Sequence, residues 1–126
     1  MRISSFNQQF LKHAMAVDSL GKPKKNELAH GLCYYWAHVF AKVIGGKCVT
    51  VGTKNLKGEM AGHMMVLYNG NYYDAENLIG RKTPIIYRSI SSIWTHLSAE
   101  DAQKFWKTPK SELAIHSLVI KKMRSI

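Results

Sequence analysis

Residues 62–75 read GHMMVLYNGNYYDA, and this stretch decides the fold because it has the pattern of a β-hairpin. Asn69 and Gly70 separate two apolar and aromatic runs. Both central residues of a type I′ turn need positive φ, which makes Asn-Gly the strongest short-range hairpin signal. If these two residues form the loop, Tyr68 pairs with Asn71 and the register of the whole hairpin follows.

In that register His63 and Asp74 lie on one face of adjacent strands, as diagonal neighbours. Moving the loop by one residue keeps them on the same face. Such neighbours are about 7–8 Å apart along the backbone, within reach of an imidazole and a carboxylate. Glu76 lies on the same face directly opposite His63, so it is the alternative partner for the imidazole.

A second stretch, residues 31–46, reads GLCYYWAHVFAKVIGG and predicts a largely buried helix that begins near Cys33 and ends at Gly45-Gly46. A helix N-terminus favours negative charge, and the thiolate is the reactive form of cysteine. An imidazole can take the thiol proton, and a carboxylate can orient the imidazole. Cys33, His63 and Asp74 are therefore the candidate catalytic residues.

These residues also fit other interpretations. A lone cysteine is commonly a small buried apolar residue, and for Cys48, in the strand pattern KCVTV, that interpretation is preferred. A zinc site is disfavoured, because the H-x2-C-x4-H spacing matches no closed structural site and the sequence has no CxxC pair to complete one. Its candidate ligands would be His30, Cys33, His38 and His63. We expect neither a metal nor a cofactor.

At these residues the chain resembles the papain-like and transglutaminase-like superfamily of cysteine acyl-transfer enzymes. The resemblance covers residues 31–75, under half of the chain. It implies a helix that carries the nucleophile Cys33 at its N-terminus, packed on an antiparallel sheet that supplies His63 and then Asp74. The context of the acid, Tyr-Asp-Ala, also fits that family.

The chain departs from the papain pattern because no Gln shortly precedes the cysteine; that neighbourhood holds Asn26 and Glu27. An ionised Glu only accepts hydrogen bonds, so the backbone N–H of Cys33 and the Asn26 amide are the candidate oxyanion donors. Tyr34 and Tyr72 flank the site and are candidates for lining an acyl-group pocket. The missing Gln favours transferase, deamidase or amidase chemistry over proteolysis.

The rest of the sequence completes the prediction of the fold. The expected elements are a helix over 6–20, a strand over 48–51, a polar loop over 52–62, a loop over 78–84, a short strand over 85–87, a helix over 98–106 that opens with a capping box, and a last strand over 113–120. The predicted class is α+β, a single domain over residues 1–126 with N-terminal helices packed on an antiparallel sheet.

Composition and charge indicate which partners the protein can bind and in which compartment it works. The chain has 126 residues and a formal net charge of +10, which attracts polyanions. Nucleic acid is not favoured, because neither an Arg-rich helix face nor an aromatic-basic RNA-binding motif is present. We expect a protein or peptide substrate, and steering favours an acidic one. No apolar run reaches about 18 residues and no signal peptide is recognisable, so we expect a cytoplasmic protein without a membrane span and with both cysteines reduced.

Two functions remain open from the sequence. The first is a cysteine-dependent acyl-transfer enzyme: a peptidase, amidase, deamidase or transglutaminase-like enzyme acting on an amide or ester. The alternative is a catalytically silent basic protein of the same fold that binds or inhibits a protein or nucleic-acid partner. An enzyme needs the Cys33 sulfur near His63, whereas a binding protein would have Cys33 buried and unreactive.

Overall fold

In the computed structural model, which describes residues 1–17, 33–54, 60–83 and 91–126, helices pack on an antiparallel sheet. The five strands are β1 (Lys47–Lys54), β2 (Met60–Tyr68), β3 (Asn71–Asp74), β4 (Asn77–Arg81) and β5 (Ser91–Leu97). Their order in the sheet is β4-β3-β2-β1-β5, and every neighbouring pair is antiparallel. The predicted α+β class is confirmed.

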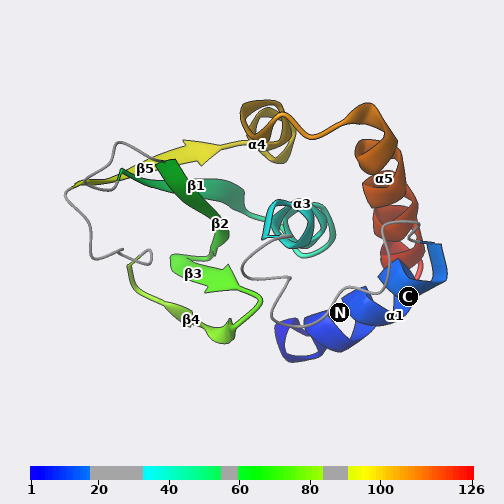
Figure 1. The fold of residues 1–126 in the computed structure, drawn as a ribbon. Coiled ribbons are helices and arrows are strands. Elements are labelled where there is room, and N and C mark those ends of the chain that lie inside the picture. The colour runs from blue at the N-terminus through cyan, green and yellow to red at the C-terminus, as the bar shows by residue number, and fades with distance from the viewer. Residues whose placement is uncertain (18–32, 55–59, 84–90) are drawn as a thin grey trace.

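The helices lie on one side of this sheet. They are the short η1 (Ile3–Ser5), α1 (Phe6–Val17), α3 (Cys33–Val43), α4 (Ala99–Trp106) and α5 (Lys110–Arg124). Figure 1 shows α3 between the sheet and α5, with α1 beside α5 and α4 near the β1 and β5 edge. None of these described helices is long and apolar enough to cross a membrane.

Aromatic side chains from three elements join α3 to its surroundings. Phe40 of α3 packs edge-on against Phe6 of α1, with ring centroids 4.9 Å apart. Its other neighbours are Trp36 at 4.9 Å and Tyr73 of β3 at 5.6 Å. Offset and edge-on aromatic pairs stabilise beyond the area they bury. This cluster fixes the position of α3, and therefore of its first residue, relative to β3.

The end of α3 is set by two glycines with positive φ, Gly45 at 131° and Gly46 at 102°. A Cβ at Gly46 would lie 2.4 Å from the backbone oxygen of Leu67, so only glycine fits. The chain can then turn directly from α3 into β1, and the predicted helix end at Gly45-Gly46 is confirmed.

The main contact of the capping box predicted at the start of α4 is present. The Ser98 hydroxyl oxygen accepts a hydrogen bond from the backbone N–H of Asp101 at 3.1 Å, which satisfies one of the unpaired donors of the first turn. The helix ends at Trp106, followed by Lys107 in the left-handed conformation, φ 57°. The prediction of a helix over 98–106 is confirmed.

Two predicted elements were wrong, and one strand was missed. Residues 113–120, predicted as a strand, lie in α5, because the buried positions recur at helical spacing; they are His116, Val119, Ile120 and Met123. Residues 78–84 were predicted as a loop, but most of that stretch belongs to the half-exposed edge strand β4. Strand β5 had no counterpart in the prediction. The strand expected over 85–87 lies outside the described residues.

The predicted boundaries around the loop over 52–62 also change. β1 continues to Lys54 and β2 already begins at Met60, so both strands extend into the segment expected to be loop. Pairing along the two strands runs from Lys47 with Leu67 to Lys54 with Met60. Residues 18–20 of the first predicted helix lie outside the described residues, and α1 is described to Val17.

Candidate active site

Cys33 is the first residue of α3, as the sequence predicts. The first N–H groups of a helix have no partner within the helix, so negative charge is favoured at this end. The side chain of Cys33 is buried, with 3% of the residue exposed, and it belongs to the main apolar cluster. The thiol is therefore held at a helix start and within the core.

The hairpin that carries the other two residues has the predicted register. Tyr68 pairs with Asn71, and the pairing continues through Val66 with Tyr73. Asn69 and Gly70 form the loop with φ values of 50° and 79°, as a type I′ turn requires. The register follows from the turn.

The structure brings His63 and Asp74 into direct contact. The His63 Nε2 atom lies 3.1 Å from Oδ2 of Asp74, and both side chains are 6% exposed. The second carboxylate oxygen, Oδ1, accepts hydrogen bonds from the backbone N–H groups of Glu76 and Asn77 at 3.0 and 2.9 Å. The turn between β3 and β4 therefore fixes the position of the carboxylate, and the carboxylate fixes the orientation of the imidazole.

The residues on either side of this carboxylate are buried as well. The pairing of β3 with β4 shifts between Tyr72 and Asp74. Tyr73 and Ala75, two positions apart, both join the cluster around α3, and Asp74 between them meets His63.

The charge state of His63 follows from its two partners. Burial acts to lower the pKa of His63, but the hydrogen bonds with the Asp74 carboxylate and with the Cys33 side chain raise it to about 9. Burial likewise opposes ionisation of Asp74, but the hydrogen bond from His63 lowers the pKa of that carboxyl below its ordinary value. At neutral pH His63 is therefore an imidazolium between Cys33 and a carboxylate.

The two ring nitrogens of His63 can serve different partners. Nε2 is occupied by Asp74, which leaves Nδ1 for the sulfur of Cys33. An imidazole held in this way can exchange a proton with a thiol while the carboxylate keeps its orientation. The three predicted residues form one connected group.

Glu76 does not take the position of the orienting acid. Its side chain is exposed, and its backbone N–H donates to Asp74. Within the described residues, the carboxylate that contacts His63 is therefore that of Asp74.

The residues predicted to line a substrate pocket are not brought together. Tyr34 donates its hydroxyl to Glu112 of α5 at 3.0 Å and stacks on Trp106, so it faces the helices. Tyr72 packs with Val49 and Met65, in a cluster separate from the one around α3. Asn26 lies outside the described residues.

Asn7 is a supporting residue that the sequence did not indicate. Its Oδ1 accepts from the indole N–H of Trp36 at 2.7 Å, and its Nδ2 donates to the backbone oxygen of Ala75 at 2.8 Å. The amide thereby ties α1 to α3 and to the residue that follows Asp74. No sequence pattern marks such a long-range bridge.

A histidine pair was also missed. His38 and His116 are 78 positions apart, and their Nδ1 atoms lie 2.9 Å apart. Burial lowers the pKa of His38 to about 4 and that of His116 to about 3, so both are neutral at pH 7. His38 contacts another histidine and not Cys33. Within the described residues, no group of three or more His, Cys, Asp or Glu side chains is arranged to hold a metal ion.

Searches of protein-family models, of curated proteins and of solved structures find no match to this chain. What the protein does is therefore inferred from the chemistry of the site.

Proposed function

We propose that this protein is a cysteine-dependent acyl-transfer enzyme in which Cys33 is the nucleophile, His63 the proton carrier and Asp74 the residue that orients His63. The observation that supports the proposal most strongly is the connected group itself. A buried imidazole has a carboxylate on Nε2 and a thiol at a helix N-terminus as its other partner.

The proposed reaction begins with the thiolate of Cys33 attacking the carbonyl carbon of an amide or ester. The backbone N–H of Cys33, which has no partner within the helix, stabilises the oxyanion. The imidazolium of His63 gives its proton to the leaving amine or alcohol, and a thioester remains on Cys33. Water or an amine then attacks the thioester, His63 accepts its proton, and the thiolate is released.

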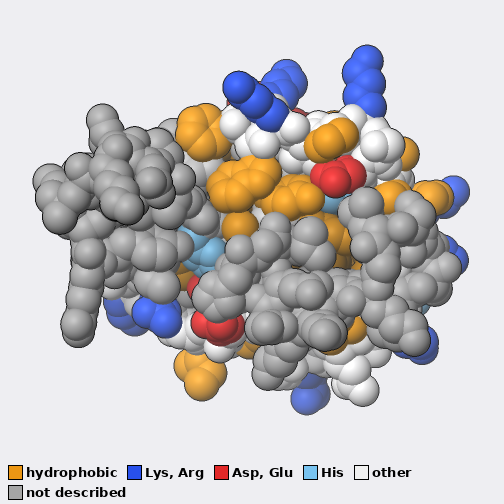
Figure 2. Space-filling view, viewed as in Figure 1, with side chains coloured by type: hydrophobic (Ala, Val, Ile, Leu, Met, Phe, Trp, Pro, Cys, Tyr) orange, Lys and Arg blue, Asp and Glu red, His pale blue; other side chains and the backbone are white. Residues whose placement is uncertain are grey.

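We extend this proposal to the fold family, the substrate and the cellular location. The helix with the cysteine at its start and the antiparallel strands that supply His and Asp support a papain-like or transglutaminase-like core. We further propose a peptide or protein substrate and a cytoplasmic location, where the two free cysteines would stay reduced. On the face seen in Figure 2, the Lys and Arg side chains of the described residues lie around the outline, and the formal net charge of +10 would steer an acidic protein substrate towards the molecule.

One observation favours the catalytically silent alternative. Cys33 is only 3% exposed, and a nucleophile must reach its substrate. A protein of this fold that binds a partner through its basic surface would not need an accessible thiol. The two functions differ in whether Cys33 can be acylated.

The test is acylation by p-nitrophenyl acetate, followed by release of p-nitrophenolate and by intact mass. We expect an acetyl adduct on Cys33 that turns over in the wild type and in Cys48→Ser, but not in Cys33→Ser. His63→Gln should slow the reaction about 10²–10⁴-fold, the usual contribution of general acid–base catalysis. An unmodified Cys33, or equal rates with and without His63, would favour the silent alternative.

A further inference from the structure

The side chain of Asn7 links the two parts of the chain that carry the candidate active site. Its Oδ1 accepts a hydrogen bond from the indole N–H of Trp36 at 2.7 Å, and its Nδ2 donates one to the backbone oxygen of Ala75 at 2.8 Å. An indole nitrogen can only donate and a carbonyl oxygen can only accept, so the partners define both ends of the amide. Trp36 lies one turn after Cys33 on α3, and Ala75 directly follows Asp74.

These links close a ring of contacts that passes through the site. From Asn7 the ring follows the first turn of α3 to Cys33, whose side chain is a hydrogen-bond partner of His63. His63 contacts Asp74 at 3.1 Å. The next residue along the chain, Ala75, returns the ring to Asn7. A displacement of α3 relative to β3 must therefore stretch either the hydrogen bonds of Asn7 or the contact between Cys33 and His63.

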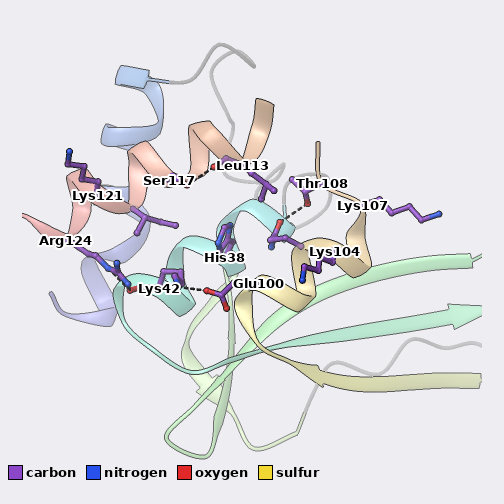
Figure 3. Close-up of a pocket in the computed structure, with 12 residues that line it drawn as sticks. His38, Lys42, Glu100, Lys104, Lys107, Thr108, Leu113, Ser117, Lys121 and Arg124 are labelled. Atoms are coloured by element: carbon purple, nitrogen blue, oxygen red, sulfur yellow. Dashed lines mark hydrogen bonds and ion pairs between the residues drawn. The ribbon is translucent and has the colours of Figure 1, made fainter. Parts of the chain in front are cut away.

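The other side of α3 gives its first turn less support. His38 follows Trp36 by two positions, so the two side chains point about 160° apart around the helix. His38 lines a cavity of about 630 Å³ between α3, α4 and α5 (Figure 3). A helix that borders a cavity has fewer packed atoms to resist a tilt towards it. Gln103 of α4 does hold the backbone oxygen of Tyr34 at 3.1 Å, but α4 carries none of the three candidate residues.

An aromatic contact also joins α3 to β3, but it lies farther along the helix. Phe40 stacks on Tyr73 with ring centroids 5.6 Å apart. Phe40 follows Cys33 by seven positions, about 10 Å along the helix axis, whereas Trp36 follows it by three, about 4.5 Å. Apolar contacts tolerate small shifts because they have no preferred direction, but a hydrogen bond weakens when its length or angle changes. The link closest to the nucleophile is therefore the one through Asn7.

We propose that Asn7 is a positioning residue of the candidate active site, whose amide holds the first turn of α3 at the distance from β3 at which Cys33 meets His63. This role rests on the proposed acyl-transfer function. Asn7 acts through Trp36 and Ala75 and takes no part in the chemistry itself. A displacement of about 1 Å can slow a reaction about 10²-fold, so breaking this link affects the rate as well as the stability.

The first readout is the rate at which p-nitrophenyl acetate acetylates Cys33, at a temperature where circular dichroism shows every variant fully folded. Asn7→Leu keeps the approximate size of the side chain and removes both hydrogen bonds, so it should slow acetylation about 10- to 100-fold. Ala14→Gly, at a buried position elsewhere on α1, is the matched control. It lowers stability without breaking the ring and should leave the rate within about twofold of the wild-type rate.

A second readout needs no reaction and separates the positioning role from the acyl-transfer proposal. Burial acts to lower the pKa of His63, but its hydrogen bonds with Asp74 and Cys33 raise that pKa to about 9. A looser ring should therefore lower the pKa of His63 in Asn7→Leu by about one pH unit, which an NMR titration measures. Ala14→Gly should keep the wild-type value, because loss of stability alone does not change these contacts in the folded protein.

Trp36→Phe tests the same link from α3 and gives the answer if Asn7→Leu does not fold. It retains an aromatic ring but loses the N–H that donates to Asn7, so both readouts should change in the same direction. A wild-type titration in these variants, or a slower rate that Ala14→Gly reproduces, would overturn the positioning role. If wild-type Cys33 is not acetylated at all, the acyl-transfer proposal fails, and the titration alone decides the role of Asn7.

Discussion

The Nε2 atom of His63 lies 3.1 Å from Oδ2 of Asp74, across two strands joined by the Asn69-Gly70 turn. The carboxylate is itself held by two backbone N–H groups through its other oxygen. An acid fixed in this way can define both the orientation and the charge of the imidazole. The relationship is useful because it can be measured before any substrate is known.

Replacing Asp74 with Asn should lower the pKa of His63 from about 9 by about one to three pH units, since the charge that favours the imidazolium is lost. A histidine titration by NMR measures this directly. Glu76→Gln is the matched control and should leave the titration unchanged. Once a substrate is found, Asp74→Asn should reduce turnover by up to about 10⁴-fold. A larger effect of Glu76→Gln on either readout would assign the orienting role to Glu76.

The raised pKa of His63 also has a consequence for stability. Its folded value of about 9 lies above the ordinary value of 6.5, so His63 stabilises the fold fully below pH 6.5, and this contribution is lost as the pH rises through 9. Chemical denaturation at pH 6.5 and pH 9.5 should show a loss of stability in the wild type. The loss should be smaller in Asp74→Asn. An equal loss in both proteins would mean that the pair does not cause it.

The two cysteines should differ in reactivity. Burial, assisted by Glu100, raises the pKa of the Cys48 thiol to about 12, and its Sγ lies 3.8 Å from the backbone oxygen of Ala37. Cys33, beside the imidazolium of His63, should be alkylated faster by iodoacetamide at neutral pH, as peptide mass spectrometry would show. His63→Gln should remove most of that difference. Faster modification of Cys48, or protection of Cys33 in the native state, would contradict the proposed nucleophile.

The local parts of this site could be predicted because each depends on a short stretch. Asn69-Gly70 dictates a type I′ turn, the turn dictates the register, and the register places His63 and Asp74 together. The apolar helix that ends at Gly45-Gly46 could also be predicted from the sequence. The sequence pattern does not reveal which face of the sheet α3 covers. Met64 and Val66 pack in its cluster, whereas Met65 packs in the other.

The C-terminal part was harder because its signals are ambiguous or distant. A run of eight residues such as 113–120 can fit both a strand and a helix, and only the packing of His116 against Tyr35 and His38 resolves it. The edge strand β4 is half exposed and so shows little alternation. The His38–His116 pair joins residues 78 positions apart, which no local pattern reveals.

Asn7 should be important for the stability of the site, although it is not part of the chemistry. Asn7→Ala leaves the indole N–H of Trp36 and the backbone oxygen of Ala75 without their partner, and each buried unsatisfied group costs about 1–3 kcal/mol. We expect a lower free energy of unfolding in urea denaturation. Gln8→Ala, at an exposed position of the same helix, is the control and should change little. Similar effects of the two substitutions would show that the bridge is not important.

The His38–His116 pair should make the protein sensitive to acid. Their folded pKa values of about 4 and about 3 lie below the ordinary value of 6.5, so protons bind more tightly to the unfolded chain as the pH falls. Stability should therefore decrease from pH 6.5 towards pH 4, by up to about 1.4 kcal/mol per pH unit for each histidine. Urea denaturation at pH 6.5 and pH 4.5 measures the slope.

The variant that isolates this effect is His116→Gln, which removes one titrating ring of the pair. Its stability at pH 6.5 should be lower, because His116 stacks on Tyr35 with centroids 4.2 Å apart. Its loss between pH 6.5 and pH 4.5 should nevertheless be smaller than that of the wild type. His13→Gln, on α1 and outside the pair, should keep the wild-type slope. If His116→Gln has the wild-type slope as well, the acid sensitivity arises elsewhere in the chain.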